Sequence, residues 1–228
     1  MRSFVSWPCP VPGGGTADEN ALLFDQARQY RVLVVPAFFD EANKLRRQVV
    51  AVMDRLDHSG IDSFLPDFPG CNDSLQPLEK QTLAGWRFAA EAAQMHFRAT
   101  HCLTIRSGAL LAPPDLPGWR YAPAGGSQLI RAMMRARTIA AKEAGRDESM
   151  AAIEAAGRKA GTELAGWSLG TEMFSSLVDA KLPEAEGLTD IPQGDIGGSG
   201  LWLRAEPGED QSQADALAAI IAVGVLGQ

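Results

Sequence analysis

The stretch RVLVVPAFF, residues 31–39, decides the fold class, because it is apolar along nearly its whole length. A strand with one wet face alternates polar and apolar residues, whereas a continuous apolar run is typical of a strand buried on both faces of a parallel sheet. Outward from this run, three other stretches predict further strands: NALLFD (20–25), IDSFLPDFPG (61–70) and HCLTIRSG (101–108). We therefore expect a mostly parallel sheet.

Two segments between these strands have the spacing of helices that pack on a sheet. Within 41–58 the apolar residues recur at helical spacing as Leu45, Val49, Val52, Met53 and Leu56. Within 78–98 one helical face carries Trp86, Ala89, Ala93 and Phe97. Strands that alternate with helices of this length predict βαβ units, so the expected fold class is α/β, a sheet flanked by helices.

The alternation breaks in the second half of the chain. Residues 119–124 predict one more strand, and a mostly helical, Ala-rich segment follows. We expect that segment, about 127–186, to be a helical cap inserted into a single domain that spans 1–228. SGLWLRAE (199–206) predicts a return to strand structure, and 213–223 predicts a closing helix.

The net charge, the lengths of the apolar runs and the cysteines limit the classes of function that this chain can have. A formal net charge of −7 provides no basic surface for nucleic acid. The longest apolar run, 214–227, is too short to span a bilayer, and the N-terminus lacks the apolar core of a secretory signal. Three cysteines without metal-site spacing indicate a reducing compartment. We expect a cytoplasmic protein without membrane insertion and without a metal or other cofactor.

AGWSLGTEM (165–173) contains a match to G-x-S-x-G, the turn that presents the nucleophilic serine of α/β-hydrolases. An elbow serine needs an apolar strand before it, but the preceding GRKAGTELAG is rich in glycine and carries three charges. We therefore interpret Ser168 as a decoy. The expected local structure is a helix start in which Ser168 or Thr171 is the N-cap.

The histidines support the same interpretation. In α/β-hydrolases the acid and the histidine follow the serine along the chain. The three histidines of this chain all precede Ser168: His58, His96 and His101. We expect His58 at a helix end, His96 in mid-helix and His101 at the amino end of a strand. Without a histidine to orient, Glu206 and Asp210 are expected to be solvated loop charges.

DFPGCNDS, residues 67–74, resembles the D-x-P-G-x-G-x-S segment that follows the fourth strand of α/β-hydrolases. This resemblance implies that 101–106 is the fifth strand, so that the nucleophile position lies in the turn directly after it. Arg106 stands in the serine position there. The nearby hydroxyl, Ser107, is one residue late, in the position whose backbone N–H helps to form the oxyanion hole.

A closer resemblance covers nearly the whole chain. PAFFDEANKLRRQ (36–48) is similar to the P-F-x-E-E-x-N-K-x-R-R stretch of the exosortase A system-associated hydrolase 2 family. IRSGALLA (105–112) resembles that family's L-R-x-G-A-L-L-A, and ELAGWSLGTEM (163–173) resembles a segment of its cap. The resemblance implies an α/β-hydrolase-like fold with a degenerate nucleophile elbow and a helical cap. It also implies a role in exopolysaccharide production. This chain departs from the family at its end, where we expect a truncated C-terminus.

Two roles are open for Arg106. A helix start offers free N–H groups to an anion, and a guanidinium adds a bidentate partner, so this turn could bind a small anionic ligand. Alternatively, Arg106 pairs internally with Asp67 or Glu41 and fills the former pocket. Glu41 and Lys44 stand at a helix start and either cap it or line the site. The candidate ligand-binding residues are Phe38, Glu41, Lys44, Arg106 and Ser107.

Three functions remain open at this point. The first is a non-catalytic protein that binds a ligand or partner in an exosortase-linked system. The second is a carboxylesterase or thioesterase that uses Ser107 as its nucleophile. The third is an unrelated role on a shared fold, since fold alone does not determine function. The basic segment RAMMRAR (131–137) is either a homodimer surface or a cover over the pocket.

Overall fold

The computed structural model describes residues 2–184 and 186–227. Within these ranges, seven strands form one sheet in the order β1-β2-β4-β3-β5-β6-β9. These strands are β1 (Arg2–Pro10), β2 (Thr16–Phe24), β3 (Arg31–Val35), β4 (Asp62–Pro66), β5 (His101–Ile105), β6 (Gly118–Tyr121) and β9 (Leu188–Ile191). From β4 to β9 all neighbours are parallel, whereas β1 and β2 add an antiparallel edge. The predicted mostly parallel sheet is confirmed.

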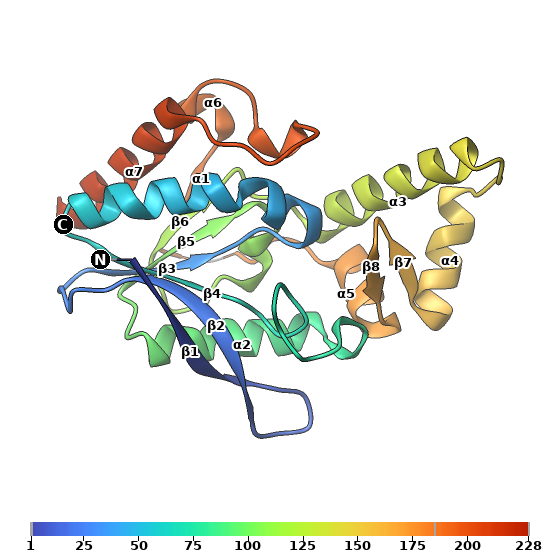
Figure 1. Ribbon diagram of the computed structural model, residues 1–228, viewed down its shortest axis with the longest axis horizontal. Coiled ribbons are helices and arrows are strands. Elements are labelled where there is room, and N and C mark those ends of the chain that lie inside the picture. The colour runs from blue at the N-terminus through green and yellow to red at the C-terminus, as the bar shows by residue number, and fades with distance from the viewer. Residues whose placement is uncertain (1, 185, 228) are drawn as a thin grey trace.

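Helices cover both faces of this sheet (Figure 1). They are α1 (Phe39–His58), α2 (Leu83–His96), α6 (Gln193–Ile196) and α7 (Gln211–Leu226). Helices α1 and α7 lie side by side on one face, and α2 lies on the other. Every residue predicted for the apolar stripe of α1 is buried, as is every one predicted for α2, so both helical predictions are confirmed.

The segment between β6 and β9 projects from one end of the sheet as a cap (Figure 1). Its elements are α3 (Gly126–Glu143), α4 (Met150–Ala160), β7 (Thr162–Leu164), β8 (Trp167–Leu169) and α5 (Thr171–Asp179). The side chains of Phe174 and Leu177 in α5 belong to the same buried apolar cluster as Trp86 of α2. This shared cluster anchors the cap to the sheet.

Three short 3₁₀ helices complete the described elements: η1 (Leu78–Lys80), η2 (Arg106–Leu111) and η3 (Leu201–Leu203). The strand predicted over 199–206 is therefore wrong, because Leu203 N–H and Arg204 N–H donate to carbonyls three residues back. The last strand is β9 instead. A four-residue edge strand with two exposed side chains has almost no hydrophobic pattern by which to recognise it.

The prediction for the first strand was incomplete. Strand β2 is longer than the predicted 20–25, and it pairs with β1, which was not predicted. A pattern was present, since Trp7 and Cys9 are buried while their neighbours Ser6 and Pro8 are exposed. Such a short alternation gives only a weak signal, and pairing with β2 is what makes it a strand.

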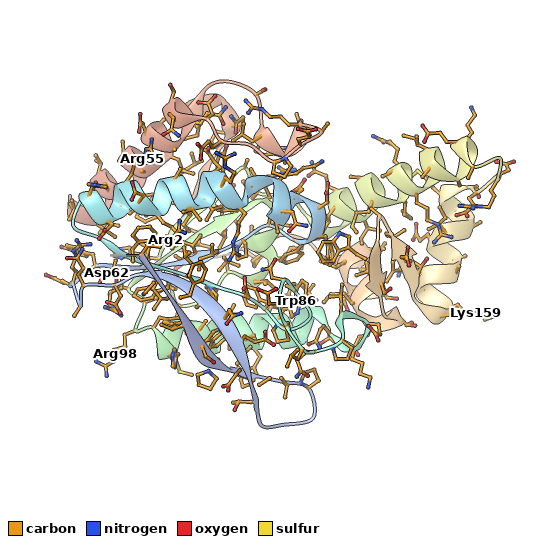
Figure 2. The ribbon with its side chains drawn as sticks, in the orientation of Figure 1. Arg2, Arg55, Asp62, Trp86, Arg98 and Lys159 are labelled. Carbon is orange, nitrogen blue, oxygen red and sulfur yellow. The ribbon has the colours of Figure 1, made fainter. Side chains whose placement is uncertain are left out.

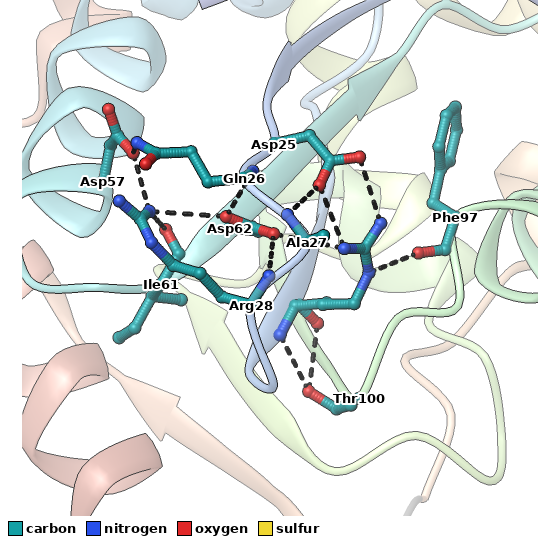
Figure 3. Close-up of polar contacts among 10 residues, drawn as sticks. Asp25, Gln26, Ala27, Arg28, Asp57, Ile61, Asp62, Phe97 and Thr100 are labelled. Carbon is teal, nitrogen blue, oxygen red and sulfur yellow. Dashed lines mark hydrogen bonds and ion pairs between the residues drawn. The ribbon is translucent and has the colours of Figure 1, made fainter. Parts of the chain in front are cut away.

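A network of ionised side chains ties the amino ends of the strands together (Figure 3). The buried carboxylate of Asp62 accepts hydrogen bonds from the backbone N–H groups of Gln26 (3.0 Å) and Arg28 (2.8 Å). The Arg31 guanidinium bridges Asp62 (3.1 Å) and Asp25 (3.0 Å). Two guanidinium groups and several backbone N–H donors bind the three carboxylates of this network, which thereby holds the β2–β3 loop against β4.

Candidate functional site

The turn after β5 has the geometry of a nucleophile elbow. Arg106 follows the strand directly with φ +53°, a left-handed conformation that is strained for any residue other than glycine. Two residues on, a Cβ on Gly108 would lie 2.4 Å from the carbonyl oxygen of Pro36 and 2.6 Å from that of Val35. Only glycine fits so close to β3. This sharp strand-to-helix turn is where an α/β-hydrolase presents its serine, and here it presents Arg106.

The guanidinium of Arg106 has internal partners on all sides. Its Nε and Nη2 donate to the two carboxylate oxygens of Glu41, each at 3.2 Å, and its Nη1 donates to the Ala122 carbonyl at 2.7 Å. The ring of Trp202 lies 4.0 Å from the guanidinium carbon, in a cation–π contact. The side chain of Arg106 is 9% exposed. Of the two internal partners expected for it, Glu41 is the one observed.

Ser107 is fully buried beneath this turn. Its Oγ accepts a hydrogen bond from the backbone N–H of Phe38 at 2.9 Å. Phe38 lies in the loop after β3, which in α/β-hydrolases supplies one N–H of the oxyanion hole. In this chain the Phe38 N–H already donates to the Ser107 hydroxyl, so it is not free to stabilise an oxyanion.

The three histidines lie far from the elbow. His101 is the first residue of β5, five residues before Arg106, and a strand rises about 3.3 Å per residue, so roughly 16 Å separate them. His101 stacks on Trp119 at a ring distance of 5.8 Å. His58 and His96 are the last residues of α1 and α2, and both are exposed. His96 is thus at a helix end, not in mid-helix as predicted.

A cavity of about 570 Å³ lies between the elbow and the cap. It is bounded by the start of α1, the turn at Arg106, one face of α3 and the 3₁₀ helix η3. Three predicted ligand-binding residues line it: Glu41, Lys44 and Arg106. The other two, Phe38 and Ser107, do not, because both are buried beneath the turn.

Sequence reasoning missed Trp202 as part of this cavity. The residue was assigned to a strand over 199–206, whereas η3 brings its ring onto Arg106. For the basic segment RAMMRAR (131–137), the sequence leaves two alternatives, a homodimer surface or a cover over the pocket. Arg131, Met133 and Arg135 of that segment line the cavity, as a cover over the pocket requires.

An aromatic cluster fills the space beside the elbow. The rings of Phe38, Phe39 and Trp86 lie within 5.1–6.0 Å of one another, and Trp86 is labelled in Figure 2. From the cap, Trp167 packs on Phe39 at 5.5 Å. The enclosed cavity left among these side chains is about 30 Å³, room for a single water molecule.

The G-x-S-x-G match lies in the cap, in the β7–β8 hairpin. Ala165 and Gly166 form its two-residue turn with φ +50° and +83°, so the first glycine of the motif serves a hairpin turn of the mirror-image type. Side chains alternate along a strand, so Trp167 and Leu169 face inward and Ser168 is exposed. No sheet strand leads into an elbow at this serine.

A close backbone contact explains why the second glycine of the motif, Gly170, is a glycine. A Cβ on Gly170 would lie 2.1 Å from the carbonyl oxygen of Glu79. Gly170 is also the N-cap of α5, so the expectation that Ser168 or Thr171 caps the helix is wrong. Gly166 thus allows the positive φ of the hairpin turn and Gly170 allows a close backbone contact, and together they reproduce the motif by coincidence.

The DFPGCNDS loop after β4 is held by its own polar groups. The carboxylate of Asp67 accepts from Arg46 (2.9 Å) and from the side-chain amide of Asn72 (2.5 Å). The Oγ of Ser74 accepts from the N–H of Gly70 at 2.9 Å and donates to Glu19 at 2.7 Å. Asp67 is therefore engaged with Arg46 and not with Arg106.

Glu19, the acceptor of that last bond, is a buried carboxyl on β2. Burial raises the pKa of Glu19; the hydrogen bond from Ser74 opposes this shift, and the charge of Asp67 adds to it. Native Glu19 thus holds its proton at higher pH than unfolded Glu19. Stability is lost as the pH rises from the unfolded pKa, about 4.3, through the raised native one.

We expect Glu19→Gln to remove this loss, because glutamine cannot ionise and its oxygen still accepts from Ser74. The Tm of the variant should match that of the parent near pH 4 and exceed it at pH 7, as measured by circular dichroism melts across that range. Glu206→Gln, at an exposed glutamate, is the control and should change neither value. A lower Tm for Glu19→Gln at pH 7 would show that ionised Glu19 is stabilising.

The two downstream acids are structural or solvated. Glu206 is exposed, as expected. Asp210 is not a free loop charge: it is the N-cap of α7, and its carboxylate accepts from the N–H of Gln213 at 3.0 Å. The prediction of a solvated Asp210 is therefore wrong.

Within 2–184 and 186–227, no three His, Cys, Asp or Glu side chains are grouped so as to hold a metal ion. Over the same ranges, no helix combines the length and the apolar character that a bilayer crossing requires.

The chain matches no family model, and no curated protein matches its sequence. Among solved structures, it is similar to a putative hydrolase from Agrobacterium vitis S4, with TM-score 0.59, 12% identity and 99% of both chains covered. It is also similar to Est1E from Butyrivibrio proteoclasticus, with TM-score 0.58, 11% identity and coverage of 97% of this chain and 98% of that one. Alpha/beta hydrolase domain-containing protein 10 from mouse has TM-score 0.51, 13% identity and coverage of 100% and 99%. With its parallel sheet, elbow and cap, the chain has an α/β-hydrolase fold.

Proposed function

We propose that this chain is a non-catalytic protein of α/β-hydrolase fold that holds a small ligand in the cavity between its sheet and its cap. The observation that carries the proposal is Arg106 in the elbow, paired with Glu41. A guanidinium is protonated at every physiological pH and has no lone pair to attack an acyl carbon. The residue that the elbow presents is therefore unable to act as a nucleophile.

The surroundings of Ser107 argue against a second nucleophile. An acyl-transfer serine needs a base within hydrogen-bond reach and free oxyanion N–H groups. The Ser107 Oγ is buried and occupies the Phe38 N–H, and the three histidines lie at the other end of the sheet. Esterase activity through Ser107 would require this loop to rearrange.

The cavity supports the binding part of the proposal. Its volume of about 570 Å³ is in the range of small-molecule sites. It lies at the carboxyl ends of the parallel strands, where α/β proteins bind their ligands. From the resemblance at 36–48 and 105–112, we further propose that this binding serves an exosortase-linked system of exopolysaccharide production.

A fluorophosphonate probe tests the non-catalytic role, because it forms a covalent adduct with activated serines. We expect the intact mass of the folded chain to be unchanged after incubation, while an active serine esterase is labelled in parallel. An adduct that peptide mapping assigns to Ser107, and that is absent from Ser107→Ala, would overturn the proposal in favour of an esterase or thioesterase. Ser168→Ala is the matched control for the motif in the cap.

A further inference from the structure

Two arginines of α3 line the cavity without an internal partner. Arg131 and Arg135 are four residues apart, so they lie on the same face of the helix, and both are exposed. Among the described residues, neither guanidinium has an ion pair or a hydrogen bond. Arg137, on another face of α3, is by contrast bound to Glu148 at 2.6 Å and to Thr162 at 2.7 Å. The cap thus provides hydrogen-bond partners for Arg137, whereas Arg131 and Arg135 line the cavity without such partners among the described residues.

The acidic residues of the cavity do not neutralise this pair. Asp40 is bound to Lys44 at 2.8 Å, and Glu41 is bound to Arg106. The lining therefore holds four basic side chains against two carboxylates, within a chain whose formal net charge is −7. Like charges four residues apart on a helix repel each other, and an anion between them relieves that repulsion.

Apolar side chains from a second element line the same cavity. They are Trp202 and Leu203 of η3, whereas Met133 of α3 is two residues from each arginine, on another face of the helix, and is only 5% exposed. Leu203 is 75% exposed although it is a large apolar residue. A ligand that covers Leu203 would remove apolar surface from water.

We propose that the cavity binds an amphipathic anion. Its phosphate or carboxylate head lies between Arg131 and Arg135, and its apolar part lies against Trp202 and Leu203. The inference deepens the proposed function and rests on it, since it names the class of ligand for the same cavity. The Arg106–Glu41 pair is the floor of the site and not its anion receptor, because both groups are already engaged.

Calorimetric titration of the full chain tests this with octyl phosphate, octanoate, octanol, octyltrimethylammonium and inorganic phosphate. We expect the two amphipathic anions to bind more tightly than octanol and inorganic phosphate, and the cation not to bind. A preference between octyl phosphate and octanoate then identifies the head group. In Arg131→Ala/Arg135→Ala, affinity for the preferred anion should fall by about 100-fold, since each of the two charge-assisted hydrogen bonds contributes roughly tenfold.

A matched control separates the site from the general charge of the cap. Lys142→Ala/Lys159→Ala removes the same formal charge from exposed positions of α3 and α4 outside the cavity, and we expect it to leave affinity within about twofold. Equal losses in both double variants, no loss in the arginine variant, or no binding of either amphipathic anion would overturn the inference. Equal binding of octanol and octyl phosphate would overturn the anion assignment and leave the proposed function intact, whereas a fluorophosphonate adduct would overturn the proposed function.

Discussion

Arg106→Ala is expected to lower the free energy of unfolding by about 3 kcal/mol, because it leaves the Glu41 carboxylate without its partner in a site that is mostly closed to water. The side chains of Arg106 and Glu41 are 9% and 19% exposed, so the penalty is below that of a fully buried pair. Loss of the Trp202 contact adds to it. For a domain of this size the Tm should fall by about 6–12 °C, as measured by calorimetry.

Arg106→Gly is the informative companion variant. Both variants lose the ion pair, but glycine accepts φ +53° without strain, whereas alanine does not. We therefore expect Arg106→Gly to be more stable than Arg106→Ala by about 1 kcal/mol. Glu41→Gln completes a double-mutant cycle and should give a coupling energy above about 1 kcal/mol.

These variants separate the two roles that the sequence left open for Arg106. An arginine that fills the former pocket predicts lost stability. A Tm within about 2 °C of the parent, together with loss of octyl phosphate binding, would instead make Arg106 a ligand-binding residue. Ligand affinity should therefore be measured on the same samples.

Gly170→Ala is expected to have an effect of similar size, about 3 kcal/mol, although it adds a single methyl group to the cap. That Cβ would lie 2.1 Å from the carbonyl oxygen of Glu79, so the junction between α5 and η1 must move. Gly166→Ala should cost about 1 kcal/mol, because the turn needs φ +83° there. Ser168→Ala should stay within about 0.5 kcal/mol of the parent, since its side chain is exposed.

This order of effects follows from backbone geometry, since the exposed Ser168 side chain contributes little to folding. Urea denaturation of the three variants measures it directly. If Ser168→Ala abolished fluorophosphonate labelling of the chain, the interpretation of Ser168 as a decoy would be wrong.

The sequence by itself determined the central strands of the sheet and its two main helices. RVLVV is apolar enough to be read as a buried strand, and the stripes of α1 and α2 follow the helical period closely. It also determined that Ser168 has no downstream histidine, because the order of residues along the chain is a property of the sequence alone. Local pattern suffices where one element buries one continuous face.

Only the tertiary structure decided what surrounds Arg106. Glu41 lies 65 residues before it and Trp202 lies 96 residues after it, and no local pattern specifies that pairing. The same holds for β9, whose strand structure comes from its pairing with β6, and for the cavity, whose walls come from α1, α3 and η3. These features depend on contacts between elements that are distant in the chain, whereas periodicity reports only on the environment of each element separately.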